Sequence, residues 1–235
     1  MDAILSAQSS PNTPMHVTGP KDLVAEANHR IANSLTLLVS MVRMQATQVC
    51  SHPGPFSTSD VRLMLEGIAA RINTLSQLHR LLSHADAEGT TNLKPHLKDV
   101  TDALVAALSS SEQHVTVRHS GTDCMVMMRH VQPVILILCE IFINAMKYAH
   151  PTGVPLLVSV DCRASADGRL VLSVSDDGIG LPEDFDVKQG GGLGFRVMRG
   201  LAAEIGADFA IHSSNLGVSF RLSLPQSSMA SDKLA

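Results

Sequence analysis

The sequence lacks the features of a nucleic-acid-binding protein. It contains no Trp, and aromatic residues make up only 3% of its 235 residues, so aromatic platforms for stacking single-stranded bases are not expected. Lys and Arg together number 18 against 22 Asp and Glu, which gives a net charge of −4. Because nucleic-acid binding normally requires a basic surface, this balance argues against such a partner.

The sequence also lacks targeting segments, membrane spans and closely spaced cysteines. Its longest apolar stretch, Val131–Cys139, is too short to cross a bilayer, and the polar, Pro- and Ser-rich start of the chain does not have the pattern of a signal peptide. The four cysteines include no C-x-x-C spacing, which favours free, buried thiols in a reducing compartment. We therefore expect a cytoplasmic protein without a membrane partner, and a disordered leader over residues 1–19.

The first predicted helix, from about Pro20 to Cys50, presents a histidine on a polar face. At about 100° per residue, the apolar side chains of this segment form one stripe, and Glu26, His29 and Asn33 lie in a polar stripe on the opposite side. A neutral imidazole is nucleophilic near neutral pH, because the ordinary pKa of histidine lies close by. His29 is therefore a candidate nucleophile that another group can reach.

A second predicted helix, Asp60–Ala85, follows a turn at Ser51–Ser59 that is rich in Pro, Gly and Ser. Its apolar residues recur at steps that alternate between three and four, as in the seam of a helical bundle. A two-helix hairpin with one apolar stripe per helix cannot bury that surface alone. We expect either a homodimer with a four-helix bundle or packing of the stripe on the chain's own second domain.

Beyond a predicted polar hinge at Glu88–Asn92, helices alternate irregularly with strands that look antiparallel. Because the spacing is not that of regular βαβ units, we expect an α+β protein whose C-terminal half is an α/β sandwich followed by a flexible tail, residues 225–235. The predicted helices are Leu93–Leu108, Val131–Ala149 and Leu193–Ile205, and the predicted strands are His114–Arg118, Met125–Met128, Leu156–Arg163, Arg169–Ser175, Asp208–Ser213 and Val218–Leu224.

The apolar helix Val131–Ala149 carries three polar residues that share one side. Glu140 and Asn144 are four residues apart and Lys147 is three further on, so their side chains project close together. Oxygen ligands from Glu and Asn suit Mg²⁺, and Lys suits phosphate. The alternative is a helix end at which polar residues simply meet solvent.

Two glycine clusters flank a segment with the length of a mobile lid. Asp176–Gly180 directly follows a predicted strand, and Gly190–Gly194 opens the next predicted helix. Glycines permit close approach of the backbone to a ligand, and the N–H groups at a helix N-terminus bind anions. The second cluster is neither a Walker A loop nor a dinucleotide-binding fingerprint. Residues Leu181–Gln189, between the clusters, are the predicted lid.

The order of these motifs resembles the ATP-binding domain of histidine kinases, the Bergerat fold shared with gyrase-type ATPases. The segments that carry the resemblance are E-x-x-x-N-A-x-K-Y at Glu140–Tyr148, D-x-G-x-G at Asp176–Gly180, G-x-G-L-G at Gly190–Gly194 and Gly-Val-Ser-Phe at Gly217–Phe220. His29–Leu35 resembles the H-box of the HWE-related class, in which Arg follows the histidine, and Arg71-Ile72 with Leu78-His79 resembles its second helix. The resemblance covers about residues 21–224.

The resemblance implies a role for each of the main polar residues. His29 would accept the γ-phosphoryl group of ATP, and Glu140 would polarise a water or help to activate the histidine. Asn144 would coordinate Mg²⁺ and Lys147 would contact phosphate. Asp176 would accept a hydrogen bond from the adenine amino group.

Further residues would complete the site. Glu26 could orient His29 or take its proton, and Asn33 could position a water for dephosphorylation of a partner. The alternatives are a solvated helix residue for Glu26 and a residue of a polar bundle face for Asn33. Gly178 and Gly180 would shape the pocket floor, Gly192 and Gly194 would cradle the phosphates, and Ser219 would lie near the adenine. The remaining implied nucleotide-binding residues are Tyr148, Gly190 and Leu193.

The sequence departs from the family pattern at several positions. Asp177 stands where Asn is commoner, and Ala32 stands where Lys is common in these H-boxes. The Trp-x-Glu signature cannot be present in a chain without Trp. These departures indicate a relative of the HWE class rather than a strict member.

The resemblance implies a two-component histidine kinase that phosphorylates His29 and then an aspartate on a response-regulator receiver domain. The expected organisation is a dimerisation and phosphoacceptor hairpin over residues 20–87 and an ATP-binding domain over residues 93–224. Input could come from a separate sensor protein. The alternatives are a histidine phosphotransferase with an idle ATP-like domain, and a dimeric module that binds nucleotide without turnover. The intact glycine boxes favour the kinase.

Overall fold

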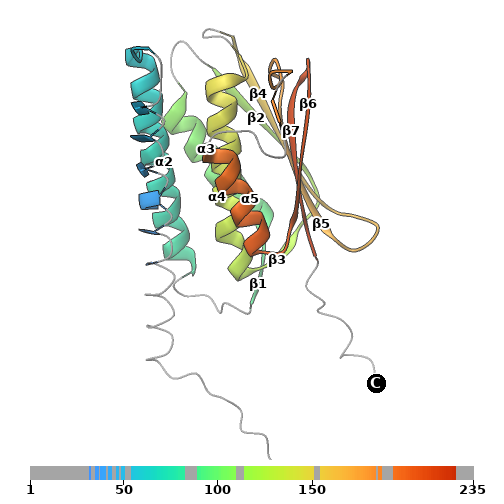
Figure 1. The fold of residues 1–235 in the computed structure, drawn as a ribbon. Coiled ribbons are helices and arrows are strands. Elements are labelled where there is room, and N and C mark those ends of the chain that lie inside the picture. The colour runs from blue at the N-terminus through green and yellow to red at the C-terminus, as the bar shows by residue number, and fades with distance from the viewer. Residues whose placement is uncertain are drawn as a thin grey trace, which may run out of the picture.

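The computed structural model describes residues 54–82, 89–109, 114–150, 154–183, 185–186 and 193–225, together with individual helical positions between 32 and 50. Figure 1 shows three layers: helix α2, then helices α3, α4 and α5, then a twisted sheet. The helices are α2 (Thr58–Leu82), α3 (Leu93–Leu108), α4 (Met128–Tyr148) and α5 (Leu193–Glu204). The strands are β1 (Thr90–Asn92), β2 (Val115–Gly121), β3 (Met125–Met127), β4 (Leu156–Ala164), β5 (Leu170–Asp176), β6 (Asp208–Ser214) and β7 (Gly217–Leu224).

The main sheet has five strands in the order β2-β4-β5-β7-β6. Strand β4 and most of β7 alternate buried and more exposed side chains, and the buried set packs beneath the helices. The expectation of antiparallel strands is wrong for one pair, because β2 and β4 are parallel. Helix α4 lies between these two strands in the chain, and a crossover of this length is what a parallel pair requires.

The segment predicted as a polar hinge is partly a strand. Thr90–Asn92 forms β1 and pairs antiparallel with β3, a contact that three polar residues gave no pattern to predict. The Asn92 side chain caps α3 by accepting a hydrogen bond from the backbone N–H of Lys94, and it also accepts one from the backbone N–H of Cys124, both at 3.2 Å. This small sheet therefore fixes the start of α3 next to the start of α4.

Helix α4 is the centre of the core, with 14 of its 21 residues buried. It has the length and hydropathy of a membrane span, yet 78% of its most apolar stretch is buried inside this fold. Its apolar side chains contact the sheet on one side and α2, α3 and α5 on the others. Because α4 is buried on all its sides, its sequence is apolar throughout rather than along one stripe.

Helix α2 packs against α3 and α4 through only one of its sides. Ala70, Arg71, Thr74 and Leu75 are buried there. Apolar residues of the seam predicted from the sequence, including Leu65 and Ile72, remain exposed. The helix therefore carries a second apolar face that the described part of the chain does not cover.

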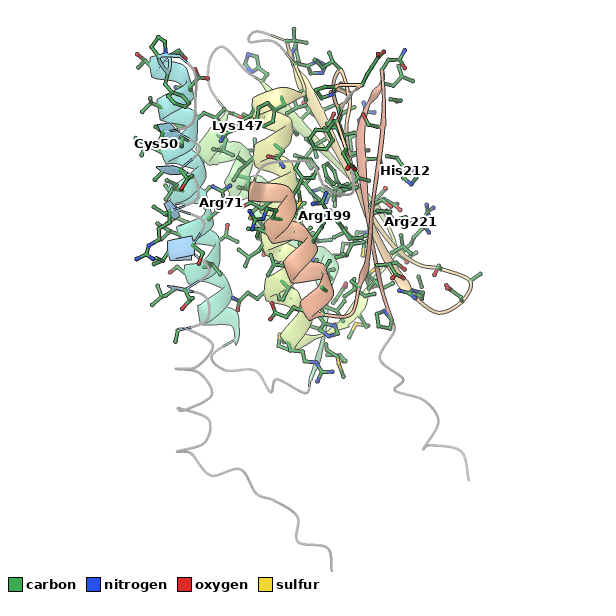
Figure 2. All side chains as sticks on the ribbon, in the orientation of Figure 1. Cys50, Arg71, Lys147, Arg199, His212 and Arg221 are labelled. Atoms are coloured by element: carbon green, nitrogen blue, oxygen red, sulfur yellow. The ribbon has the colours of Figure 1, made fainter. Side chains whose placement is uncertain are left out.

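The expectation for the cysteines is correct at three positions and wrong at one. All four thiols are free, and Cys124, Cys139 and Cys162 are buried. Cys50 is exposed (Figure 2). Burial raises the pKa of the Cys139 thiol to about 12. The predicted leader, residues 1–19, and the tail beyond Pro225 lie outside the described residues.

Candidate functional site

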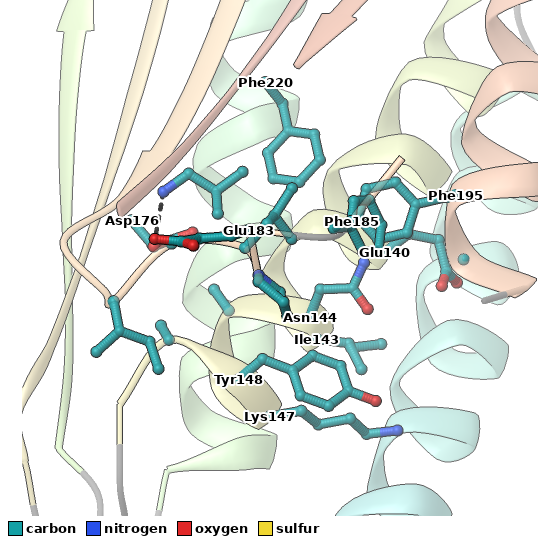
Figure 3. A pocket seen from close by; sticks show the side chains of 18 of the residues that line it. Glu140, Ile143, Asn144, Lys147, Tyr148, Asp176, Glu183, Phe185, Phe195 and Phe220 are labelled. Atoms are coloured by element: carbon teal, nitrogen blue, oxygen red, sulfur yellow. Dashed lines mark hydrogen bonds between the residues drawn. The ribbon is translucent and has the colours of Figure 1, made fainter. Parts of the chain in front are cut away.

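A cavity of about 630 Å³ lies between α4, the segment that follows β5, the start of α5 and strand β7. Figure 3 shows Asp176 at one end of this cavity and Glu140 and Lys147 toward the other. Aromatic and aliphatic side chains, among them Phe195 and Phe220, form the walls between the two ends. A largely apolar cavity with a few converging polar groups is the usual form of a small-molecule site.

Asp176 is held at its end of the cavity by the backbone. Its Oδ1 atom accepts hydrogen bonds from the N–H groups of Gly178, at 3.0 Å, and Val218, at 3.1 Å. Among the described residues these bonds engage one oxygen only, so Oδ2 is left to accept a bond from a ligand. A carboxylate fixed in this way can recognise an amino group on a flat, apolar ring system.

Two glycines allow the backbone to close around Asp176. A Cβ on Gly178 would lie 2.5 Å from the Cα of Ala149, at the end of α4, and the neighbouring Ile179 donates its N–H to the Ala149 carbonyl at 2.9 Å. Gly217 has a φ of +119°, and a Cβ there would lie 2.1 Å from the carbonyl oxygen of Asp176. Only glycine fits either position without displacing the backbone around Asp176.

Glu140, at the other end, is paired with an arginine from α2. The Nε atom of Arg71 donates to Oε1 of Glu140, and Nη2 donates to Oε2 at 2.9 Å. The two residues are 5% and 4% exposed. From the sequence, Arg71 is only part of the resemblance to the second helix of the family and has no chemical role. A cation that shares one helix side with Gly67, Ile68 and Leu75, three or four residues away, is the signal that could have identified it.

The start of α5 lies directly against Glu140 and Asn144. A Cβ on Gly194 would lie 3.1 Å from Oε2 of Glu140 and 3.4 Å from Nδ2 of Asn144. The buried Nδ2 atom of Asn144 has no hydrogen-bond partner among the described residues. A helix N-terminus that meets an unsatisfied amide forms a polar cradle, and such N-termini attract anions.

Lys147 lines the same end of the cavity. Desolvation, and then the positive charge of Arg71, lower the pKa of its ammonium group, while Glu140 and Asp60 oppose the shift. Figure 3 shows the ammonium group directed away from Asp176. Tyr148, which follows Lys147, also lines the cavity.

Asp177 has a structural position outside the cavity lining. Its Oδ1 atom accepts bonds from the backbone N–H of Leu157 and from Nε2 of His150, each at 3.0 Å. Desolvation acts to raise the pKa of Asp177, but these two bonds together lower it below the ordinary value. The acid found where Asn is commoner therefore joins the end of α4 to the start of β4.

Most of the predicted nucleotide-binding residues that the structure describes lie at the cavity, but Ser219 does not line it. Val218 and Phe220 line the cavity, and the alternation of β7 directs the intervening Ser219 side chain to the opposite face of the sheet. The residues from the predicted set that line the cavity are Glu140, Asn144, Lys147, Tyr148, Asp176, Gly180 and Gly194. Gly178 is not among the lining residues, but it packs against Ala149 and donates its N–H to Asp176.

Several predicted site residues lie outside the described part of the chain. They are Glu26, His29, Asn33, Gly190 and Gly192. Leu193 opens helix α5, but its side chain is not described.

Two family models match the chain, one in each half. The model described as histidine kinase-, DNA gyrase B- and HSP90-like ATPase matches residues 130–228. The model described as histidine kinase matches residues 26–108. Together they span most of the chain and include both His29 and the cavity. The chain belongs to the histidine kinases. Its C-terminal half is therefore an ATP-binding domain, as the order of the motifs predicts, and its relatives support the HWE-related class.

Similar proteins carry the same family name. The chain is 26% identical over 208 residues to blue-light-activated histidine kinase 2 of Erythrobacter litoralis, covering 87% of this chain and 57% of that protein. It is 24% identical over 184 residues to the sensor histidine kinase PdtaS of Mycobacterium tuberculosis, covering 77% of this chain and 34% of that protein. The chain thus spans about half the length, or less, of these relatives.

A solved structure shows the same fold. The histidine kinase domain of the Erythrobacter litoralis EL346 blue-light-activated histidine kinase matches with a TM-score of 0.64 and 24% identity, covering 86% of this chain and 93% of that one. The likeness confirms the predicted combination of an N-terminal helical region with a C-terminal α/β domain.

Proposed function

We propose that this chain is an ATP-dependent histidine autokinase that phosphorylates His29 and passes the phosphoryl group to an aspartate on a response-regulator receiver domain. The observation that carries the proposal is the position of the cavity. Its polar end is bounded by Arg71 of α2, so the proposed phosphate end of the nucleotide site faces the region whose family match includes His29.

The cavity residues fit ATP. Asp176, with one oxygen held by two backbone N–H groups, would accept a bond from the adenine amino group through the other. The start of α5 at Gly194 and the ammonium group of Lys147 would hold the phosphates. Gly190 and Gly192 would continue the phosphate cradle toward the lid.

Asn144 and Glu140 fit a magnesium ion that accompanies the phosphates. Mg²⁺ prefers oxygen ligands and usually takes only one or two of them from the protein. Asn144 would present its side-chain oxygen with its amide turned toward the cradle. The bound ion would neutralise charge on the transferred phosphoryl group.

Phosphoryl transfer would proceed by attack of the neutral His29 imidazole on the γ-phosphorus of ATP. The bond from phosphorus to the β–γ bridging oxygen breaks, ADP leaves, and the proton on the phosphorylated imidazole is lost to a base such as Glu26 or Glu140. The resulting phosphoramidate is labile. It would serve as the donor to the receiver aspartate, while Asn33 could position a water for the separate hydrolytic dephosphorylation of the receiver.

We further propose that the functional unit is a cytoplasmic homodimer. The supporting observation is the uncovered face of α2, where Leu65 and Ile72 are 57% and 47% exposed. A second copy of the hairpin, residues 20–87, would bury this face in a four-helix bundle. The ATP-binding domain, residues 93–224, would then lie on the outside of that bundle.

The proposal is tested by incubating the purified chain with Mg²⁺ and γ-labelled ATP, beside a His29→Ala variant and a His212→Ala control. His212 is exposed on β6, away from the cavity. We expect label that is stable to alkali, labile to acid, absent from His29→Ala and retained in His212→Ala. Nucleotide binding without any label would contradict the kinase and favour a binding module. Absence of both would favour a phosphotransferase, to be tested with a phosphorylated receiver domain.

A further inference from the structure

Arg71 joins the helical hairpin to the ATP-binding domain inside the candidate site. It projects from α2 and reaches Glu140 of α4 by two hydrogen bonds. Figure 2 shows Arg71 and Lys147 where these two helices face each other. Both partners of the pair line the cavity, so the pair belongs to the wall of the nucleotide site as well as to the packing of α2.

The pair leaves part of the guanidinium group unused. Arginine has five N–H donors, and the bonds to Glu140 use Nε and Nη2. The Nη1 atom is buried and has no partner among the described residues. It lies over Gly67, where an added Cβ would be 3.4 Å away, and Gly67 is close to Ile143 of the cavity wall. A buried, unsatisfied charged donor is costly unless a ligand completes it.

The charged side chains that line this end of the cavity do not balance either, although Asp60, outside the lining, also acts on Lys147. Glu140 supplies one negative charge, while Arg71 and Lys147 supply two positive ones. The start of α5 adds the partial positive charge of a helix N-terminus, within contact of Glu140. An anion, such as the terminal phosphate of a nucleotide, would be attracted to this end.

We propose that Arg71 is a residue of the nucleotide site that recognises the terminal phosphate of ATP from the helical hairpin. The inference rests on the proposed ATP-binding function. Without nucleotide, Arg71 is held by Glu140. When a terminal phosphate enters, the guanidinium group turns its free donors to the phosphate, and Glu140 loses part of its pairing and becomes available to act on His29. With ATP, but not with ADP, the link between the hairpin and the ATP-binding domain would then run through the nucleotide instead of through the Arg71–Glu140 pair alone.

The test is the ratio of the dissociation constants for Mg-ADP and Mg-ATP, measured by calorimetry on the whole chain. Two comparisons isolate Arg71: wild type against Arg71→Gln, and Glu140→Gln against the double variant Arg71→Gln with Glu140→Gln. The second pair differs only at position 71 and leaves no unpaired carboxylate, so it remains informative if Arg71→Gln alone folds poorly. Arg62→Gln is the control, because Arg62 is a half-exposed arginine on the same helix, 3.9 Å from Glu66.

We expect loss of Arg71 to lower the preference for Mg-ATP by about tenfold or more in both comparisons, with the affinity for Mg-ADP changed by less than about threefold. Arg62→Gln should leave both constants unchanged. An unchanged ratio in both comparisons, with Mg-ATP still bound, would mean that Arg71 only holds α2 against α4. That result would overturn this inference and leave the proposed function standing. Absence of Mg-ATP binding in the wild type would overturn the proposed function together with it.

Discussion

The backbone N–H of Val218 donates a 3.1 Å hydrogen bond to Oδ1 of Asp176. This bond joins the last residue of β5 to the second residue of β7, and it leaves the other carboxylate oxygen of Asp176, which lines the cavity (Figure 3), to accept a bond from a ligand. The proposed recognition of adenine depends on this orientation.

Replacing Asp176 by Asn should weaken nucleotide binding while leaving the fold intact. The Asn side-chain oxygen can still accept from the N–H groups of Gly178 and Val218, but the amide nitrogen would then face the adenine amino group as a second donor. We expect the affinity for Mg-ATP, measured by calorimetry, to fall about tenfold to a hundredfold, the effect of losing a hydrogen bond to a charged group.

The control for this variant is Asp102→Asn, which removes an exposed acid that pairs with Lys98. It should bind Mg-ATP like the wild type. Equal affinities for the Asp176 and Asp102 variants would mean that Asp176 does not contact the nucleotide.

Gly217→Ala should destabilise the chain, whereas Gly200→Ala should stabilise it. Gly217 has a φ of +119° and would bring a Cβ against the Asp176 carbonyl, at a cost of about 1–3 kcal/mol from the backbone alone. Gly200 lies in helix α5 with no atom within 4 Å of its Cβ position, so alanine there should add about 0.5–1 kcal/mol to the free energy of unfolding. Urea denaturation measures the free energy of unfolding of both variants, which should fall for Gly217→Ala and rise for Gly200→Ala. A change of the same sign in the two variants would contradict the prediction.

Arg71→Met should strongly lower the free energy of unfolding, and adding Glu140→Met should recover most of the lost stability. The single variant leaves a buried carboxylate, 4% exposed, without its partner, which typically costs about 3–5 kcal/mol. The double variant removes the stranded charge. A double-mutant cycle by urea denaturation reports the coupling, and additive effects of the two substitutions would show that the side chains do not pair.

One thiol of four should react with a thiol reagent in the native chain. Cys50 is exposed, whereas Cys124, Cys139 and Cys162 are buried, and burial raises the pKa of each of these three thiols. The thiolate is the reactive form, so rapid labelling near neutral pH should be abolished by Cys50→Ser. All four should react after denaturation. Fast labelling of a second thiol in the folded chain would contradict the packing of the core.

The sequence predicts the secondary structure of the C-terminal half well because its elements have clear periodicity. The bounds predicted for Leu93–Leu108 agree with those of α3, and every predicted strand there has a counterpart. Strand β1 has only three polar residues, too few for any pattern. The parallel pairing of β2 with β4 depends on how α4 crosses the sheet, which local pattern does not contain.

The candidate site was predictable where the motif residues lie on one element, and less so where two segments meet. Glu140, Asn144 and Lys147 share one side of α4, and spacing alone places them together. Arg71 is 69 residues before Glu140, so no local spacing connects the two. Ser219 was assigned from its motif, but the two-residue period of β7 turns its side chain away from the cavity.

The most direct test of the central claim is to locate the phosphoryl group after the chain has been incubated with Mg-ATP. Mass spectrometry of peptides prepared near neutral pH should find one added phosphoryl group on the peptide that contains His29 in the wild type, and less of it in Asp176→Asn at an ATP concentration that does not saturate the variant. Phosphorylation of the wild type at a different residue, or none under conditions in which Mg-ATP is bound, would contradict the account.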